Sequence, residues 1–400
     1  MVEVRTGSSQ KEKGFEAGKS AADKAFEGDE KLVYLFASTE FDLEEVLKGV
    51  SEVFSSTEII GCSSTAEIVG DDIFEGSVVV GTLSGDIVIG TGIGEGLEED
   101  SEGSGHSAIQ EAFKDLDCDE VTPFSKGRLS EWAEHREVFV NTFADPKHGN
   151  AEKVLEGVNS FLGPGFSSTG EFASDQYEFE NTAVFYEGEV KEDAVVTAVV
   201  DTGKSVGSAR AHGFRPTPND FDVTDVEGDV VHELSGKKPE EVYAEVFGTE
   251  KAEDPEFLLM APFGMKSSRE DIHRLRVAID VEENGCYRCL PPPSLNEDVQ
   301  LMMGEKNSML NAARKAARKA RENTGLEKSE IEAGIIFSCA ARYAIYEEAD
   351  TAEKEIHNIR KGLGENAEIF GLFGYGQIAT SEGWTSLNND TVVVQALGSK

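Results

Sequence analysis

One short motif occurs three times along this 400-residue chain, and the pattern around it repeats as well. The copies begin at Gly61 (GCSSTAEIVGD), Gly165 (GFSSTGEFASD) and Gly371 (GLFGYGQIATS). Each copy follows an apolar run and a segment with helical spacing, and each precedes a β-branched run. The second interval is close to twice the first, which leaves room for a degenerate fourth copy. A strand is predicted at 256–263, but no glycine motif follows it.

The repeat predicts an α/β fold. In the first copy, KLVYLFAST predicts a strand, and the next segment has apolar residues at helical spacing: Leu43, Val46, Leu47, Val50 and Phe54. A strand that feeds a helix and returns to its sheet favours a right-handed crossover, while the strand after the motif can be antiparallel. We therefore expect repeated strand-helix-strand-strand units that form mixed sheets covered by helices, in two domains.

Length and local composition suggest where the chain divides. Four hundred residues exceed what one hydrophobic core usually organises. The stretch GTEKAEDPE near residue 250 is polar and rich in turn-forming residues. We expect a helical lead-in at 1–30, a first domain at 31–250 and a second at 251–400.

The charge of the chain excludes some partners. Its formal net charge is −40, from 77 acidic and 37 basic side chains, yet its apolar residues lie in periodic blocks typical of a folded protein. Such a surface repels nucleic acid and anionic lipid, so neither DNA nor a membrane is an expected partner. High salt makes so much like charge tolerable, which favours a halophile with an acidic proteome. An acidic protein of a mesophile is the alternative.

The sequence indicates a soluble cytoplasmic protein. The N-terminal segment lacks the apolar core of a secretory signal, and no run of eighteen apolar residues occurs. The cysteines are odd in number and widely scattered, which suits a reducing compartment. We expect free thiols at Cys62, Cys118, Cys286, Cys289 and Cys339.

The motif copies supply candidate ligand-binding residues, because ligands gather beside loops at the strand ends of α/β sheets. Their glycines would let the backbone approach a small molecule, and their polar side chains offer hydroxyls and carboxylates. Plain turn geometry is the alternative. The candidates are Gly61, Ser63, Ser64, Thr65, Glu67, Ser168, Thr169, Glu171, Gly374, Tyr375, Gly376 and Gln377.

Four segments together resemble the FIST family, whose members have an N-terminal and a C-terminal FIST domain. They are GCSSTAEI, the HGFRPTPNDFDVTDVEGDVVHELSGKKPEEVY segment, FSCAAR at 337–342 and GLFGYGQIA at 371–379. The resemblance covers nearly the whole sequence and assigns 31–250 and 251–400 to these two domains. The chain departs from the family pattern at Ser235, where an Asp is usual, and at Gln377, where a Glu is usual.

The resemblance implies a signal-transduction sensor that binds a small polar ligand, such as an amino acid, without a cofactor, a metal or catalysis. Members are usually fused to output modules, and none is recognisable here. The expected partner is therefore a separate signalling protein, such as a kinase or a chemoreceptor component.

Several other chemical interpretations remain open. Cys339, activated by Arg342, could attack a small carbonyl or ester substrate. An adaptor without a ligand is a further alternative. His212 and Arg215 are candidate ligand contacts, since an arginine fork suits a carboxylate. We expect the loops at 61–67 and 371–377 to share one pocket, with Arg342 or Arg215 facing a ligand carboxylate and Glu67 or Glu171 facing its ammonium group.

Two further patterns have weaker functional interpretations. Cys286 and Cys289 have metal-ligand spacing but lack a second pair, so a structural zinc site is only an alternative. The basic run at 313–321 ends a helical pattern, and we interpret it as a solvated, acid-paired face.

The net charge predicts that stability rises with salt. Self-repulsion among the excess carboxylates should weaken the fold at low ionic strength and be screened as salt is added. The thermal midpoint should therefore rise between roughly 0.1 M and 2 M KCl in calorimetry. A midpoint that stays flat or falls over this range would contradict the halophile interpretation.

Overall fold

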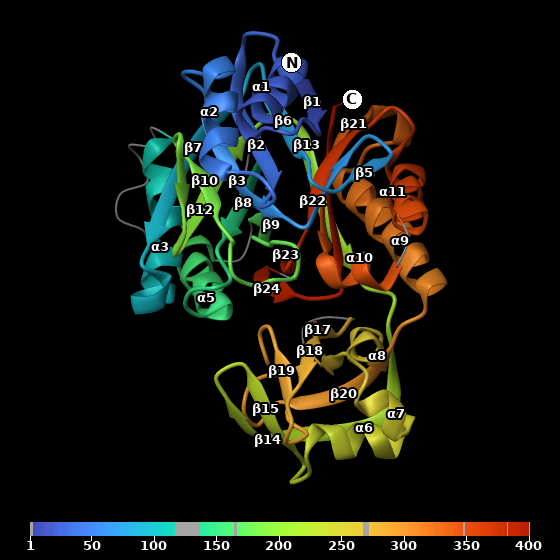
Figure 1. The fold of residues 1–400 in the computed structure, drawn as a ribbon. Coiled ribbons are helices and arrows are strands. Elements are labelled where there is room, and N and C mark those ends of the chain that lie inside the picture. Colours follow the sequence, from blue (N-terminus) through green and yellow to red (C-terminus); the bar gives the residue numbers. More distant parts are fainter. Residues whose placement is uncertain are drawn as a thin grey trace.

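The computed structural model describes residues 3–116, 137–163, 166–266, 272–346, 349–381 and 383–399. These residues form a larger body, made of three similar sheets and their helices, and a smaller domain that lies below it in Figure 1. The smaller domain comprises residues 215–303 and is inserted between two elements of the body. Within the described residues, no helix has the length and apolar character needed to cross a membrane.

Each sheet of the body has six strands, and corresponding strands of the three units occupy the same positions in each sheet. The first sheet comprises β1 (Glu3–Ser9), β6 (Val78–Ser84), β2 (Glu30–Ser38), β3 (Glu58–Ser64), β10 (Val184–Tyr186) and β11 (Glu189–Lys191). The second comprises β7 (Val88–Glu95), β12 (Ala194–Asp201), β8 (Val138–Ala144), β9 (Ser167–Phe172), β23 (Gly376–Ser381) and β24 (Trp384–Asn388). The third comprises β13 (Ser205–Ala211), β25 (Val392–Gly398), β21 (Ile331–Cys339), β22 (Glu368–Gly374), β4 (Ala66–Val69) and β5 (Asp72–Phe74).

The helices of the body cover the outer faces of the sheets. They are α1 (Gly14–Ala25) and α2 (Leu43–Val53) on the first sheet, α3 (Leu97–Asp115) and α5 (Ala151–Leu162) on the second, and α9 (Lys306–Thr324) and α11 (Ala349–Leu363) on the third. A short helix α10 (Ala340–Tyr346) follows β21, and a 3-10 turn lies at Lys328–Glu330. The predicted helix in the first copy is confirmed as α2, whose amino end is capped by the Asp42 side chain.

The inner faces of the three sheets meet in one shared core. Its aromatic side chains come from every sheet: Tyr34 and Phe36 from the first, Phe143 from the second, and Phe337 and Phe370 from the third. The Tyr34 hydroxyl donates to Asn141 Oδ1 at 2.7 Å, so the buried polar atom of this core has a partner. The predicted architecture of mixed sheets covered by helices, in two domains, is confirmed.

The sheets exchange strands in a cycle. In each unit a central parallel pair is followed by a strand that joins a neighbouring sheet: β4 pairs with β22, β10 with β3, and β23 with β9. Backbone bonds close the cycle, because Thr65 N–H donates to Phe373 O, Ser174 N–H to Ser63 O, and Tyr375 N–H to Phe172 O. The units therefore cannot be separated without leaving buried strand edges unpaired.

The smaller domain has its own sheet and core. Its seven strands, in order, are β17 (Arg274–Arg276), β16 (Phe263–Met265), β20 (Asp298–Met303), β14 (Arg215–Glu227), β15 (Val230–Leu234), β19 (Tyr287–Cys289) and β18 (Ala278–Val281). Its helices are α6 (Pro239–Phe247), α7 (Thr249–Ala252) and α8 (Pro255–Leu259).

Several predicted boundaries differ from the elements observed. The strand predicted at 256–263 is wrong over α8, where Pro255 occupies the first turn and the Asp254 side chain accepts from Glu256 N–H. Residue 250, where we expected two domains to meet, lies in α7 inside the smaller domain. The lead-in at 1–30 contains strand β1 as well as helix α1.

The second motif copy has a different register from the one its sequence suggests. Gly61 pairs with Leu35 and Gly371 with Ile336 on the central strands, and the matching position in the second unit is Gly170, which pairs with Thr142. Gly165 lies outside the described residues. At all three matching glycines a Cβ would overlap the carbonyl oxygen of the paired residue. These glycines therefore let strands approach each other closely.

Replacing these glycines should test the register. Gly170 has φ +158° and Gly61 has φ +148°, so alanine at either position meets both an unfavourable backbone and a steric overlap. We expect Gly170→Ala and Gly61→Ala to lose about 3 kcal/mol or more in urea unfolding at high KCl. Gly188→Ala is the control, because Gly188 has φ +80° but open space around it, and it should lose only about 1 kcal/mol. Equal losses at Gly170 and Gly188 would contradict the structural register.

Candidate functional site

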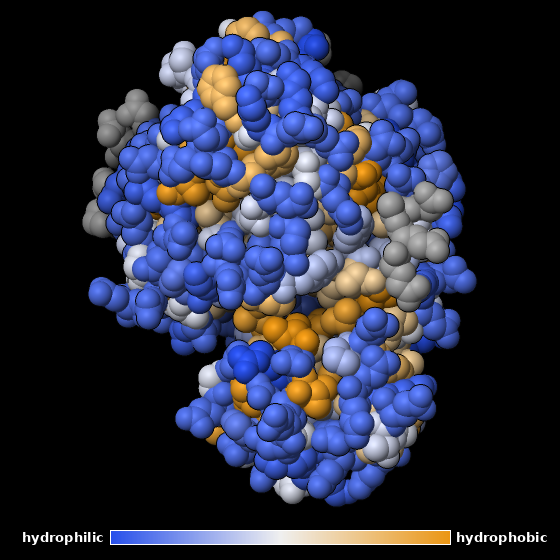
Figure 2. Space-filling model, in the orientation of Figure 1, coloured by the Kyte–Doolittle hydropathy of each residue, from blue (hydrophilic) through white to orange (hydrophobic). Residues whose placement is uncertain are grey.

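A cleft separates the body from the smaller domain. Two segments cross it, His212–Phe214 on the way out and Gly304–Glu305 on the way back. Figure 2 shows hydrophobic surface gathered along this cleft, whereas most of the visible surface elsewhere is hydrophilic. Two cavities lie there, with volumes of about 260 and 380 Å³, and Leu290 and Tyr375 line both. An apolar cleft with enclosed volume is the usual form of a small-molecule site.

The smaller of these, here called the first cavity, has walls from both parts of the molecule. Most of its lining is apolar or aromatic. The body contributes Tyr177, Phe179, Cys339, Ala340, Ala341, Ala344, Tyr375 and Asn389. The smaller domain contributes Pro255, Glu256, Leu259, Val277, Ile279 and Leu290.

A tight loop at 175–181 holds two aromatic residues against the first cavity. Tyr177 and Phe179 have φ +67° and +58°, a region that bulky residues rarely occupy. The Asp175 carboxylate holds this conformation by accepting from the backbone N–H groups of 178–181 at 2.9–3.1 Å. Burial opposes ionisation of Asp175, but the hydroxyl of Tyr375 and these N–H groups lower its pKa. Strained backbone of this kind clusters at functional sites.

Aromatic rings continue from this loop across the cavity wall. Phe179 stacks on Tyr375 with ring centroids 4.4 Å apart, and the Tyr177 hydroxyl donates to Ala340 O at 3.0 Å. Because Tyr375 follows β22 and Tyr177 follows β9, the strand exchange places residues of two units side by side.

Cys339 lies at the end of β21, where its side chain lines the first cavity and is 2% exposed. Burial, assisted by the nearby Asp390 carboxyl, raises the pKa of this thiol to about 12. The protonated form therefore dominates at neutral pH, and a protonated thiol is a poor nucleophile.

Three of the residues predicted for the ligand site lie on the cavities. Cys339 and Tyr375 line the first cavity, and Tyr375 and Gly376 line the second. The loops at 61–67 and 371–377 are also neighbours, because β4 pairs with β22 and Thr65 N–H donates to Phe373 O. Of these loops, only the second contributes to the lining of these cavities.

The carboxylates predicted to face an ammonium group are enclosed by protein. Glu67 is fully buried and accepts from Ser64 Oγ at 2.6 Å and from Ser77 Oγ at 2.5 Å. Glu171 accepts from Gly376 N–H at 3.0 Å and from the Gln377 side chain at 2.9 Å. Burial raises the pKa of Glu67 to about 8 and that of Glu171 well above its ordinary value.

The cationic residues predicted to face a ligand carboxylate are either bonded within the protein or exposed on its surface. Arg342 is fully buried, pairs with Glu355 at 2.5 Å and donates to the carbonyls of His212, Met309 and Asp390. Arg215 is exposed at the start of β14. Burial, followed by nearby Arg210 and Arg342, lowers the pKa of His212 to about 3, so His212 is neutral.

The remaining candidates stabilise the exchanged strands. Ser63 Oγ accepts from Ala183 N–H, Thr65 Oγ1 donates to Asp175 O, and Thr169 Oγ1 bonds to Gln395. Ser168 is buried, and a Cβ on Gly374 would overlap the Glu171 side chain. Ligand binding by these residues stays a prediction.

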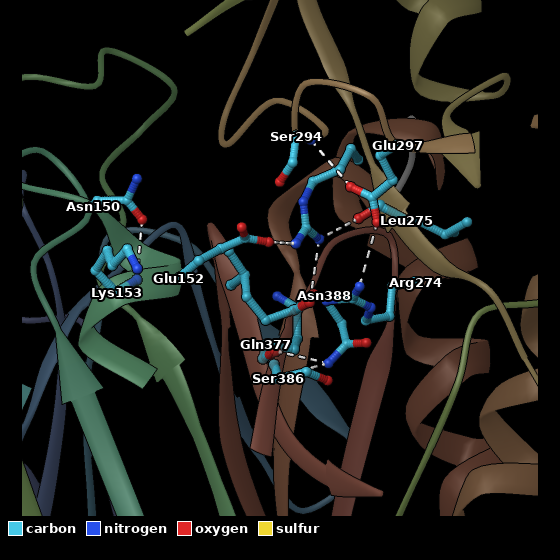
Figure 3. Close-up of polar contacts among 12 residues, drawn as sticks. Asn150, Glu152, Lys153, Arg274, Leu275, Ser294, Glu297, Gln377, Ser386 and Asn388 are labelled. Carbon is cyan, nitrogen blue, oxygen red and sulfur yellow. Dashed lines mark hydrogen bonds and ion pairs between the residues drawn. The ribbon is translucent and has the colours of Figure 1, made fainter. Parts of the chain in front are cut away.

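A buried arginine joins the smaller domain to the body. Arg276 in β17 is 0% exposed, pairs with Glu152 at the start of α5, and donates to Leu387 O at 3.2 Å. Figure 3 shows Glu152 of the body and Leu275 of the smaller domain within this set of contacts. Burial opposes ionisation of Glu152, but Arg276 outweighs it and lowers the pKa. The contact holds the two walls of the cleft together.

The cysteines and the basic run, which had weaker functional interpretations, lie in ordinary structural environments. Cys62, Cys286, Cys289 and Cys339 are buried free cysteines, and Cys118 lies outside the described residues. Among the described residues, no group of three His, Cys, Asp or Glu side chains could hold a metal ion. The basic run lies in α9, where Arg318 pairs with Glu322 and Arg321 donates to Leu326 O.

Comparison with protein families gives two adjacent matches. The FIST N domain matches residues 31–237, and the FIST C domain matches residues 239–380. The chain belongs to the FIST family. FIST domains are sensory domains of signal transduction, so the coarse function expected from the resemblance is supported. None of the curated proteins matches the chain.

Solved structures resemble this FIST protein only weakly. Two cyanuric acid hydrolase structures, one of them from A. caulinodans, align over 100% of both chains at 8% identity with a TM-score of 0.40. T. maritima PurL complexed with FGAR aligns over 99% of this chain and 72% of its own at 10% identity, with a TM-score of 0.23. Similarities this low do not indicate a shared activity.

Sequence reasoning missed most of the residues that line the first cavity of this FIST protein. The loop at 175–181 directly follows the second motif, and its two aromatic residues within a polar segment are a signal that could have been used. The contributions of the smaller domain, such as Leu259 and Val277, are ordinary apolar residues of short elements without any motif.

The buried carboxyl of Glu67 predicts a specific pH dependence. Its pKa is raised from 4.5 to about 8 on folding, so the folded chain binds the proton more tightly, and stability should fall as pH rises between these values. The Glu67→Gln variant cannot ionise at this position, so its stability should lack this dependence on pH. The difference in unfolding free energy between parent and variant should change by on the order of 1 kcal/mol per pH unit across this range.

Urea unfolding at several pH values in high KCl measures this difference. Glu44→Gln is the matched control, because Glu44 is an exposed carboxylate on α2. Parallel stability curves for the parent and Glu67→Gln would show that the carboxyl does not titrate in this way.

Proposed function

We propose that this FIST protein is a non-catalytic sensor that binds a small molecule in the first cavity. The observation that carries the proposal is the position of this cavity, whose walls come from both the body and the smaller domain. A ligand that touches both walls favours the arrangement in which they are close, so binding changes the population of that arrangement. This is the physical requirement for a sensor.

The lining defines the ligand further. Its volume of about 260 Å³ lies just below the range of drug-sized sites, roughly 300–1,000 Å³, and suits a small metabolite. Most of the lining is apolar or aromatic, with Asn389 and Glu256 as polar exceptions. The ligand should therefore combine an apolar body with a hydrogen-bonding end, a class that includes apolar amino acids.

The two crossing segments offer a route from the cavity to the smaller domain. Helix α10 lines the cavity with Ala340, Ala341 and Ala344, and its Arg342 donates to His212 O in the outgoing segment. A shift of α10 on binding would therefore act directly on the connection to the smaller domain. We propose that the signal passes to a separate protein, such as a kinase or a chemoreceptor component.

The surroundings of Cys339 support binding over catalysis. The thiol lines the cavity, but burial keeps it protonated, and the donors of Arg342 are directed to Glu355 and to carbonyl oxygens. The two residues are therefore not arranged as a nucleophile and its activator.

Filling the first cavity tests the proposal. We expect a metabolite screen by thermal shift in 2 M KCl to yield a ligand that raises the melting temperature, since ligands that bind only the folded state stabilise it. Ala341→Phe should abolish this shift, because Ala341 lines the first cavity. Ala151→Phe is the control, because Ala151 lines only the second cavity, and it should keep the shift.

A third variant separates binding from catalysis. Cys339→Ser should keep the ligand affinity within about twofold, because one thiol contact to a ligand contributes little. A covalent adduct on Cys339, or a product that the parent forms and this variant does not, would favour the enzyme.

A shift retained in Ala341→Phe but lost in Ala151→Phe would move the site to the second cavity.

A further inference from the structure

One residue that lines the first cavity has a buried acceptor atom without a hydrogen-bond partner in the part of the chain that the structure describes. Asn389 lines the cavity and is 2% exposed, and its Nδ2 donates to Tyr375 O at 2.9 Å. This bond fixes the orientation of the amide, so the atom left without a partner is the acceptor, Oδ1. A buried acceptor of this kind is costly unless a donor reaches it.

The next residue in the chain, Asp390, also has unpartnered oxygens, and burial raises the pKa of its carboxyl to about 8. Asp390 is fully buried, and neither of its carboxylate oxygens has a hydrogen-bond partner among the described residues. Asp193 has the matching place in the second unit, since both residues have positive φ just before the matching strands β12 and β25. There the protein supplies a donor, because Asp193 Oδ1 accepts from Glu98 N–H at 2.9 Å. The third unit leaves its acceptors unmatched beside a cavity.

The side walls and the mouth of the first cavity also favour a cationic ligand. Tyr177, Phe179 and Tyr375 present aromatic rings, whose faces attract cations. Glu256, an exposed residue of α8, is the single charged side chain among the described lining residues, so no lysine or arginine there offers a partner to a carboxylate or a phosphate.

We propose that the first cavity recognises a small protonated amine or amidine carried on an apolar body, and discriminates against anions. The N–H donors of the ligand would meet Asn389 Oδ1, its charge would lie among the aromatic faces, and Glu256 would contribute at the mouth. This inference rests on the proposed function, because it assumes that the first cavity is the ligand site. It goes beyond that proposal by giving the sign of the ligand charge. It also narrows the ligand class to amines without a carboxylate, so an apolar amino acid would fit the proposed function but not this inference.

Three probes that share a phenyl ring and differ in their polar end test the inference. They are 2-phenylethylamine, 2-phenylethanol and 3-phenylpropanoate, measured by calorimetry on the full chain in 2 M KCl. We expect the amine to bind about tenfold more tightly than the alcohol, because a charge-assisted bond to a buried acceptor replaces a neutral one, and the carboxylate to bind more weakly than both.

The outcomes separate this inference from the proposed function. If the alcohol or the carboxylate binds as tightly as the amine, and Ala341→Phe abolishes that binding, the cavity is a ligand site and the charge preference is wrong. If amine binding survives in Ala341→Phe, the amine site lies elsewhere and this inference fails, while the metabolite screen still decides the proposed function. If none of the three probes binds, the class of ligand named here is wrong, while the metabolite screen still decides the proposed function.

A conservative variant at the mouth keeps the test independent of folding. Glu256→Gln should weaken the amine by roughly two- to fivefold, because exposed charge pairs contribute little, and should leave the alcohol unchanged. Glu253→Gln is the matched control, an exposed neighbour that does not line the cavity, and should change neither. Equal effects of Glu256→Gln on amine and alcohol would overturn the role of its charge.

A second variant addresses the inner acceptor. Asn389→Leu removes Oδ1 and should weaken the amine by about tenfold relative to the alcohol. The variant also loses the bond to Tyr375 O, so a circular dichroism spectrum and a melting curve accompany the measurement. A folded Asn389→Leu protein that retains the full preference for the amine would overturn recognition by Asn389.

Discussion

The fold depends on three backbone hydrogen bonds that carry strands from one unit into the sheet of the next. Thr65, Ser174 and Tyr375 each donate an N–H group to a carbonyl of another unit, and the strands that follow them complete sheets begun elsewhere in the chain. Because buried backbone groups need partners, no unit of the body can satisfy its sheet alone. The close glycine positions follow from this constraint, since a Cβ at Gly61 or Gly371 would overlap the neighbouring strand.

The same exchange assembles the candidate site. Tyr375 comes from the third unit and stacks on Phe179 from the loop that follows β9 of the second, so neither half of the chain contains the site. The smaller domain closes the cavity from the other side, and the buried Arg276 with Glu152 joins the two walls. A contact between one buried charge and its partner is directional, so it favours one relative placement of the two parts over others.

The sequence predicts the elements better than their partners. The periodic segments gave α2 and the central strands, because a helix or a strand encodes its buried face locally. Strand exchange is a pairing between residues 66–69 and 370–373 and leaves no local trace. The likeness between GCSSTAEI and GFSSTGEF also suggested Gly165 as the match for Gly61, whereas the pairing with the central strand selects Gly170. The residues that line the cavity were harder still to predict, because alanine, leucine and valine carry no recognisable chemistry in a single sequence.

The polar residues that stand out in the motifs make structural contacts within the protein. Glu67 and Glu171 accept from hydroxyl and amide groups near the points where strands change sheets, and Arg342 on α10 donates to carbonyl oxygens; all three are closed to solvent. Within the described residues, Glu171 Oε2 also lacks a hydrogen-bond partner, but Glu171 does not line the first cavity, whereas Asn389 with its unpartnered Oδ1 does. Binding there adds contacts across a joint held by two crossing segments and one buried ion pair. Under the proposed function, contact with both walls is what would allow a ligand to shift a conformational equilibrium.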